Sequence, residues 1–265
     1  DCPRLAAMNI VVCVKQIPDP AAPQSLDATT HNLDRTGKLI LDEADTYGVE
    51  MGLQLVEKAG GGEVTIVSMG SAADVSGIRT ALAMGAAKAV VVSDDSLRGT
   101  DALGTAKVLA AAIKRINPDL VLCATESSDG YTGTTPVQVA EILGLPAVTF
   151  AKSVTVDGST VKVDRQTDGG YDEVTSPLPA VVTVTAGVVE PRYANFKGIM
   201  AAKSKPLEEL TAADLGLAGE TGAAGARQEI TAVVAAEARA AGEKHVDEGD
   251  GADKIVGFLE SIKVL

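Results

Sequence analysis

The sequence predicts an α/β protein with an open, mostly parallel sheet, flanking helices and an extended C-terminal arm. Up to about Thr149, short apolar runs alternate with helical segments, which implies right-handed crossovers and parallel strands. The 265 residues are 46% hydrophobic but only 3% aromatic, so a large core must be built from Ala, Val, Ile and Leu. Residues 216–251 are dominated by Ala, Gly and Glu and can bury little on their own, which predicts the arm.

The predicted strands are short apolar runs rich in β-branched residues, as expected for strands buried on both faces of a sheet. The first run, NIVVCVKQ, ends in polar residues. Similar short apolar runs recur along the chain. Strands are expected at residues 9–16, 63–69, 88–92, 119–124 and 148–156.

The segments between these strands carry apolar residues at helical spacing and end at stop signals. Gly60 and Gly85 each end a helix, Asn117 and Pro118 end a third, and Pro136 suits the first turn of a fourth. Helices are expected at 42–58, 72–84, 100–116 and 136–143, within 229–241, and at 253–265. The last helix has an apolar stripe of Ile255, Phe258, Leu259, Ile262 and Leu265.

The alternation of strands and helices ends after Thr149. Residues 153–164 and 169–184 are predicted to form an antiparallel pair joined near Asp168, and residues 191–206 are predicted to be a loop. The chain is therefore divided into an extension at 1–7, an α/β nucleotide-binding domain at 8–215 and a linker with a C-terminal helix at 216–265. The terminal helix either folds back on its own domain or embraces another subunit, and the sparse linker favours the second interpretation.

The net charge is −13, which disfavours binding to nucleic acid or to an anionic membrane. Against this background Arg192, Lys197, Lys203 and Lys205 cluster in one stretch and suggest a specific surface. Three widely spaced cysteines indicate neither a disulfide framework nor a metal site, and favour a reducing compartment. No targeting segment is recognisable, so the expected location is the cytoplasm.

The loop ATESSDGYTGTTP after the fourth strand carries most weight as a binding site. In an open parallel sheet, ligands bind beyond the carboxyl ends of the strands. Gly130 and Gly133 allow close backbone approach, and the loop runs into a helix N-terminus, which favours an anion. Taken alone, the loop is equally compatible with a phosphate cradle and with hydroxyls that only cap the helix.

The sequence offers little support for a catalytic site. The two histidines, His31 and His245, lie in an irregular excursion and in the linker, so acid–base or Ser–His chemistry is not expected. No HExxH or CxxC motif supports a metal. Cys13 and Cys123 lie in apolar strands, where inert core thiols are expected. The pattern indicates a protein that binds a nucleotide and other proteins and has no catalytic residues of its own.

Residues 161–184, VKVDRQTDGGYDEVTSPLPAVVTV, resemble the diagnostic segment of electron transfer flavoprotein (ETF) β subunits. Within it, Arg165, Gln166 and the turn Asp168, Gly169 and Gly170 form the family signature. IRTALAMGA at 78–86, Val14-Lys15 and EPRYANFKGIM at 190–200 also match, in the family's order. The resemblance implies a Rossmann-like, adenine nucleotide α-hydrolase-like fold and an obligate heterodimer with an ETF α subunit.

The resemblance also implies the cofactors. FAD is carried mainly by the α subunit and faces the β subunit, which holds a structural AMP. The positions that match the family's AMP site are Cys13, Asp42, Glu43, Ala44, Asp45, Met69, Ala124, Thr125, Glu126, Ser127, Ser128, Asp129, Gly130, Tyr131, Thr132, Gly133, Thr134 and Thr135. Asp42 replaces the family's Asn and is expected to face ribose or base, since an acid beside a phosphate is unfavourable. The family's Asn-Gln-Thr appears here as Gly133, Thr134 and Thr135.

A recognition loop for flavin dehydrogenases is implied as well, in which an apolar residue plugs a pocket on the donor. The matching positions are Arg192, Tyr193, Ala194, Asn195, Phe196, Lys197, Ile199 and Met200. Phe196 holds the anchor position, and the alternative is that Phe196 closes the local core. Gln166 stands where many members have a Glu that biases domain orientation.

The resemblance implies an electron carrier without bond-making residues, which passes single electrons from acyl-CoA or similar dehydrogenases to a membrane quinone reductase or another acceptor. One alternative within the family is a bifurcating type with a second FAD in the AMP site. A stand-alone adenine-nucleotide-binding module is the alternative from another class. A nucleotide-hydrolysing enzyme would need a pyrophosphate motif such as SGGxDS, which is not found in the sequence.

Overall fold

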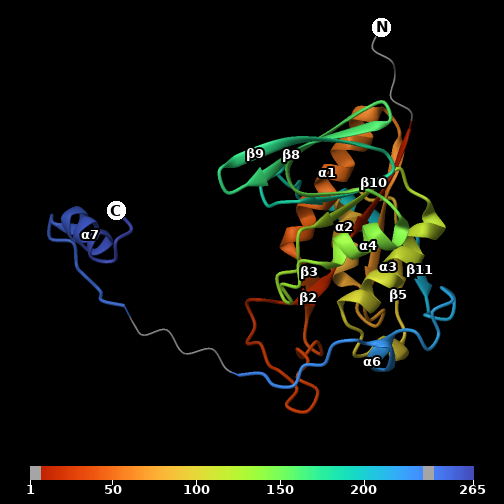
Figure 1. The fold of residues 1–265 in the computed structure, drawn as a ribbon, viewed down its shortest axis with the longest axis horizontal. Helices are drawn as coiled ribbons and strands as arrows, with labels where there is room; N and C mark the ends of the chain where they lie inside the picture. Colours follow the sequence, from red (N-terminus) through yellow and green to blue (C-terminus); the bar gives the residue numbers. More distant parts are fainter. Residues whose placement is uncertain (1–6, 235–241) are drawn as a thin grey trace, which may run out of the picture. The chain divides into compact units, whose positions relative to one another are not determined.

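The computed structural model describes residues 7–234 and 242–265. A mostly parallel sheet runs through it in the order β11-β5-β4-β1-β6-β10-β7-β8-β9, flanked by helices (Figure 1). The strands of this sheet are β1 Met8–Cys13, β4 Gly62–Met69, β5 Lys88–Val92, β6 Leu120–Ala124, β7 Ala147–Asp157, β8 Thr160–Thr167, β9 Gly170–Pro177, β10 Ala180–Val184 and β11 Leu207–Leu210. A separate antiparallel pair consists of β2 Gln16–Pro18 and β3 Leu39–Leu41.

The helices fall largely where the sequence predicts them. They are α1 Glu43–Ala59, α2 Ser76–Met84, α3 Ala102–Ile116, α4 Thr135–Leu143, α5 Phe196–Ala202, α6 Gly222–Gly225 and α7 Gly251–Ser261, with a 3₁₀ turn at Asp95–Leu97. Two helices begin later than predicted. Asp101 caps α3 by accepting from the Gly104 N–H at 2.8 Å, and Asp74 accepts from the Ser76 N–H at 2.8 Å.

Two hydrophobic clusters cover the two faces of the sheet. Because side chains alternate along a strand, Ile10 and Val12 of β1 join the cluster under α1 and α2, whereas Val11 and Cys13 join the cluster under α3 and α4. Glycine lets α1 approach closely, since a Cβ at Gly48 would lie 3.3 Å from a Val12 methyl carbon. The predicted core of small aliphatic residues is confirmed.

The region after Thr149 differs from the prediction in its details. The hairpin turn at Asp168 and Gly169 is present, and it joins β8 to β9 in antiparallel pairing. However, the run 169–184 contains two strands, and β10 returns to the parallel sheet between β6 and β7. Periodicity could not separate β9 from β10 because a strand has the same repeat in either sheet direction.

Two predictions for irregular segments need correction. Residues 191–206 are not a loop throughout, because α5 forms after Asn195, whose side chain accepts from the Gly198 N–H at 2.8 Å. This helix has seven residues, too few for a clear periodic pattern. Of the helix predicted within 229–241, residues 229–234 are not helical, and 235–241 lie outside the described residues.

The chain groups into two compact units, Asp1–Ile230 and Thr231–Leu265. Residues 216–230, expected to begin the arm, belong to the first unit. They are tied to it by the Gly222 N–H, which donates to Thr100 Oγ1 at 2.8 Å, and by the Arg227 N–H, which donates to Asp101 Oδ2 at 2.7 Å. Among the described residues, no helix has the length and apolar character needed to span a bilayer.

Candidate functional site

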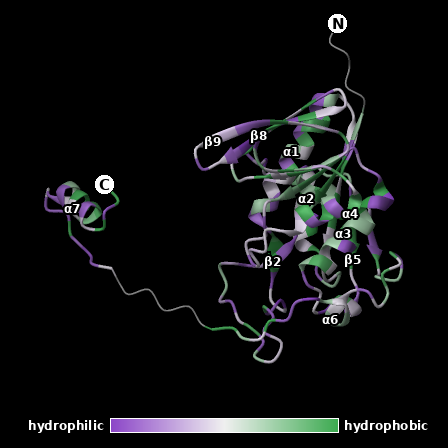
Figure 2. Cartoon of the chain, in the orientation of Figure 1, coloured by the Kyte–Doolittle hydropathy of each residue, from purple (hydrophilic) through white to green (hydrophobic). Residues whose placement is uncertain are grey.

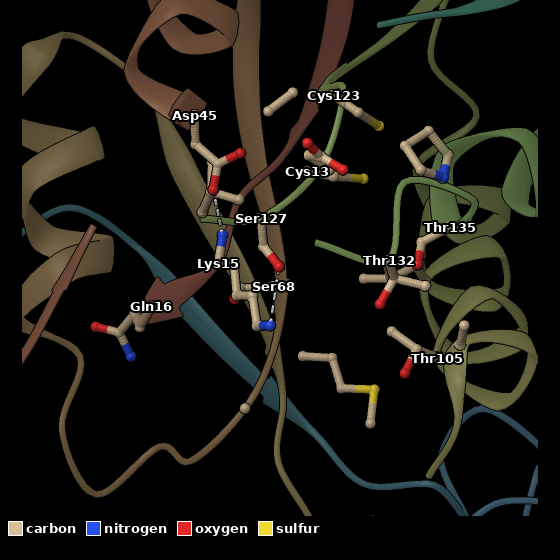
Figure 3. A pocket seen from close by; sticks show the side chains of 18 of the residues that line it. Cys13, Lys15, Gln16, Asp45, Ser68, Thr105, Cys123, Ser127, Thr132 and Thr135 are labelled. Atoms are coloured by element: carbon tan, nitrogen blue, oxygen red, sulfur yellow. Dashed lines mark hydrogen bonds between the residues drawn. The ribbon is translucent and has the colours of Figure 1, made fainter. Parts of the chain in front are cut away.

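A cavity of about 450 Å³ lies at the carboxyl ends of β1, β4 and β6. This is the edge of the sheet where ligands bind in open α/β folds, and the volume falls within the usual range for small-molecule sites. Its walls come from the ends of these strands, from the loop after β6 and from the first turns of α3 and α4. The side chains of Lys15, Asp45 and Ser127 lie on one side, with Thr105, Thr132 and Thr135 across from them (Figure 3).

Lys15 and Asp129 organise the first side of the cavity. Lys15 Nζ lies 2.7 Å from Asp129 Oδ1 and 3.2 Å from Ser127 Oγ, and Arg35 pairs with the other carboxylate oxygen of Asp129. Burial opposes the charge of Asp129, but its contacts with Lys15 and Arg35 outweigh burial and lower its pKa. The two cations are thus held at the rim by one internal acid.

Asp45 is the buried acid of this cavity. Its Oδ2 accepts from the Lys15 backbone N–H at 2.6 Å. Burial raises the pKa of Asp45 well above its usual value, although the Lys15 N–H acts in the opposite direction. Burial therefore disfavours the charged form of Asp45. Glu126 and Asp101 are further acids on the wall.

Hydroxyls and a helix N-terminus form the opposite wall. Thr132, Thr135 and Thr105 face the cavity, and α4 starts at Thr135 with Pro136 in its first turn. In this described segment, the side chain of the N-cap residue Thr134 makes no capping hydrogen bond. Backbone N–H groups of the first turn thus lack that partner, so the capping interpretation of the loop is not supported by Thr134.

Two thiols lie on the floor of the cavity. Cys13 and Cys123 come from the neighbouring strands β1 and β6, and both are buried. The pKa of Cys123 is raised well above its usual value by its contact with Cys13 and then by burial. A thiol that keeps its proton is a poor nucleophile, which agrees with the expectation for Cys123.

The structure brings half of the predicted nucleotide positions to this cavity. Those that line it are Cys13, Asp45, Met69, Ala124, Glu126, Ser127, Thr132, Gly133 and Thr135. The others do not line it: Asp42, Glu43, Ala44, Thr125, Ser128, Asp129, Gly130, Tyr131 and Thr134. The fully buried Asp42 side chain accepts from the Ser128 N–H at 2.7 Å and from Ser128 Oγ at 2.9 Å, so its oxygens hold the loop.

Sequence reasoning missed several residues of the wall. Arg35 comes from the irregular excursion, and Thr100, Asp101 and Thr105 come from the start of α3. Asp101 carried a usable signal, because an acid one residue before a helix that follows a strand sits at the same sheet edge. Arg35 had no such signal, since only the tertiary path of the excursion brings it to Asp129.

The predicted recognition segment lies at the surface. Phe196 is 79% exposed and therefore does not close the local core. Tyr193, Ile199 and Met200 are exposed with it. The four cations that sequence analysis grouped together separate into two kinds. Lys197 and Lys203 are exposed, whereas Arg192 binds Glu50 and Glu57, and Lys205 donates to the carbonyls of Leu82 and Ala86.

The signature residues lie in and beside the β8–β9 hairpin. Arg165 is 3.9 Å from Asp172 across the pair, and Gly170 has a φ of 150° at the start of β9. Gln166 lines a second, shallower hollow of about 440 Å³ together with Ala44, Thr125, Glu126, Phe150, Val184, Thr185 and Ala186. Glu126 thus belongs to the walls of both hollows.

Fold and cavity together define an open-sheet α/β protein with a ligand-sized cavity at the strand carboxyl ends. Within the described residues, no group of three or more His, Cys, Asp or Glu side chains is placed to hold a metal ion. A family model described as an electron transfer flavoprotein domain matches residues 30–215.

Curated relatives agree over most of the chain. The electron transfer flavoprotein subunit beta of Mycobacterium leprae is 40% identical over 264 residues, 97% of this chain and 99% of the relative. Those of Thermoanaerobacterium thermosaccharolyticum and Syntrophomonas wolfei are 35% and 38% identical, covering 89% and 78% of this chain and 91% and 81% of the relatives. The chain belongs to the electron transfer flavoprotein β-subunit family, and so to proteins of electron transport.

Proposed function

We propose that the chain is the β subunit of a heterodimeric electron transfer flavoprotein working in the cytoplasm. It takes part in carrying single electrons from flavin dehydrogenases, such as acyl-CoA dehydrogenases, to a quinone reductase or another acceptor. The α subunit carries the FAD, which supplies the redox chemistry when bound. The residues of this chain bind, orient and dock, and none makes or breaks a covalent bond.

The strand-end cavity is the observation that carries the proposal, with AMP as its structural ligand. A phosphate fits beside the N-terminus of α4, where Thr132 and Thr135 supply hydroxyl donors and Gly133 allows close approach. The cation Lys15 on the cavity wall favours an anion there. The apolar side chains of Met69, Leu109 and Val139 offer a surface for the base.

The nucleotide released on denaturing the purified αβ complex tests this assignment. We expect one AMP and one FAD per complex. Two FAD and no AMP would instead favour the bifurcating type. Thr132→Val should lower AMP content, whereas Thr80→Val, an exposed threonine on α2, should not. A complex that releases no nucleotide contradicts the proposal.

Partner docking is proposed at residues 192–200. Phe196 is highly exposed beside Lys197, and an apolar anchor among cations suits a transient interface. Phe196→Ala should raise the KM of a dehydrogenase for the complex about tenfold, the effect of losing one anchoring side chain. Tyr171→Ala, which removes an exposed aromatic from β9, is the matched control and should leave this KM unchanged.

Heterodimer formation is proposed to use α7, because its residues Ile255 and Phe258, and Ile262 directly after it, are exposed in the isolated chain. Phe258→Ser should weaken association with the α subunit without unfolding this chain. Size-exclusion chromatography with and without the α subunit distinguishes this from a stand-alone nucleotide-binding module. Such a module would elute as a monomer in both cases and would not associate with the α subunit.

A further inference from the structure

The exposed face of α5 is held by contacts at both of its ends. Phe196, Ile199 and Met200 lie one turn apart and are all exposed, although exposed apolar side chains on a short helix gain nothing from packing in the free chain. The orientation of this face must therefore be set by other contacts.

At the N-terminal side, Arg192 forms a fork on Glu50 of α1. Arg192 Nε donates to Glu50 Oε2 at 2.7 Å, and Nη2 donates to Glu50 Oε1 at 3.1 Å. The backbone N–H of Arg192 also donates to Glu50 Oε2 at 3.3 Å, so the main chain itself is tied to this carboxylate. Gln54 Nε2 completes the set at 2.8 Å.

Glu50 is unusual because its side chain is only 4% exposed. A carboxylate at such a depth is costly unless charged donors satisfy its oxygens, and here most of those donors belong to Arg192. Glu57, the second acid that Arg192 contacts, is 58% exposed and makes one bond of 2.7 Å. Of the two acids, only Glu50 demands a unique position of Arg192.

At the C-terminal side, α5 and α2 are tied reciprocally. Arg79 Nη1 donates to the carbonyls of Ala202 at 2.7 Å and Lys205 at 2.8 Å. Lys205 Nζ donates to the carbonyls of Leu82 at 2.8 Å and Ala86 at 2.7 Å, at the end of α2. These bonds fix the far end of α5. On the approach from Pro191 to Asn195, Ala194 packs against the hydrophobic cluster, and Arg192 supplies the ion pairs.

We propose that Glu50 is a positioning residue for partner docking: through Arg192, its buried carboxylate holds the entry to α5 so that Phe196, Ile199 and Met200 form a preorganised docking face. This inference rests on the docking role given above. Preorganisation improves affinity because the ordering cost is not incurred on binding. A buried acid in α1 would thereby orient a docking surface to which its own side chain does not belong.

The test uses the complete αβ complex and compares Glu50→Gln with the matched control Glu57→Gln. Glu50→Gln should raise the KM of an acyl-CoA dehydrogenase for the complex about five- to tenfold, leave kcat unchanged and speed amide exchange at residues 191–199. Glu57→Gln should change none of these by more than about twofold. Flavin content and the melting profile of the sheet core serve as folding controls.

Arg192→Lys provides a second variant, because lysine keeps the charge but loses the fork, and it should reproduce the rise in KM. If Phe196→Ala raises KM and neither Glu50→Gln nor Arg192→Lys does, the positioning role is overturned while the docking role stands. If Phe196→Ala has no effect, the docking role falls, and the inference falls with it. Unchanged amide exchange at 191–199 in Glu50→Gln also overturns the inference.

Discussion

Helices α1 and α7 are both amphipathic, yet they end in different environments. Of the 17 residues of α1, nine are buried, among them Val49, Met51 and Leu53. In the described part of the chain, none of the 11 residues of α7 is buried. Figure 2 shows hydrophobic and hydrophilic residues together on α7. The same kind of pattern thus produces a core helix in one unit and, in the other, a helix that finds no burial within its own unit.

The difference lies in what surrounds each helix. Helix α1 crosses β1, where Gly48 and Gly52 let it pack closely on Val12. Helix α7 belongs to the unit 231–265, which offers no sheet to cover within its described residues. Amphipathicity therefore specifies that a helix has a face to bury, while the presence of a complementary surface decides whether this happens in the same chain.

The largest expected effect on stability contrasts a residue of the core with an exposed residue of the terminal helix. Leu122→Ala removes a fully buried side chain from β6 and should lower the free energy of unfolding by about 2–5 kcal/mol. Phe258→Ala removes a side chain that is 61% exposed and should change it by less than about 0.5 kcal/mol. Urea denaturation of the isolated chain measures both. Similar decreases in the free energy of unfolding for the two variants would contradict the contrast between the core and the terminal helix.

A smaller decrease in the free energy of unfolding is expected when the buried carboxylate of Glu50 in α1 loses its cation. Arg192→Met leaves Glu50 without its cation and should cost about 1–3 kcal/mol in the free energy of unfolding. The matched control is Lys162→Met, which breaks an exposed ion pair with Asp157 and should cost less than about 1 kcal/mol. Equal effects would show that Glu50 finds another partner when Arg192 is removed.

Acid should destabilise the first unit through Glu50 and Asp129. Both carboxyl groups have a lowered pKa in the folded chain: burial opposes the shift, and contacts with Arg192 or with Lys15 and Arg35 outweigh it. A lowered folded pKa gives stability that is present above the unfolded pKa and is lost as the pH falls through the folded value. The unfolding free energy should therefore decrease as the pH drops below the ordinary pKa values, which are 4.5 for Glu and 3.8 for Asp.

Glu50→Gln isolates the contribution of one of these groups. Its unfolding free energy should depend less on pH in this acid range than that of the original chain, as measured by urea denaturation at a series of pH values. An identical pH dependence would mean that Glu50 is not the titrating group.

The smallest effect on stability is expected from removing residues 231–265. Both hydrophobic clusters lie within the first unit and stay intact, so the thermal midpoint of this unit should stay within about 2 °C. A large fall in the midpoint would show that α7 stabilises the first unit, which would contradict the contrast with α1.

Much of the fold followed from local patterns. Buried strands such as β1 and β6 were recognisable because a continuous β-branched run has few alternatives, and α1 was recognisable because its apolar spacing ends at Gly60. The short helix α5 and the return of β10 to the parallel sheet escaped because neither has a periodicity that sets it apart.

The candidate site was predictable to a similar degree. The loop 124–135 was found because it follows a strand and enters a helix at the sheet edge where ligands bind. Asp42 was expected to face a ligand, whereas its carboxylate holds Ser128 inside the protein. The direction of a side chain depends on distant donors, and these are not visible in local sequence.

By itself, the sequence determined the class of fold, the composition of the core and the family, because these depend on local periodicity and on motifs in a fixed order. Only the tertiary structure decided that Arg35 joins Lys15 on Asp129, that Glu50 lies buried under Arg192, and that Phe196 points outward. The physical reason is that burial and charge pairing arise between residues far apart in the chain, where packing alone brings them into contact.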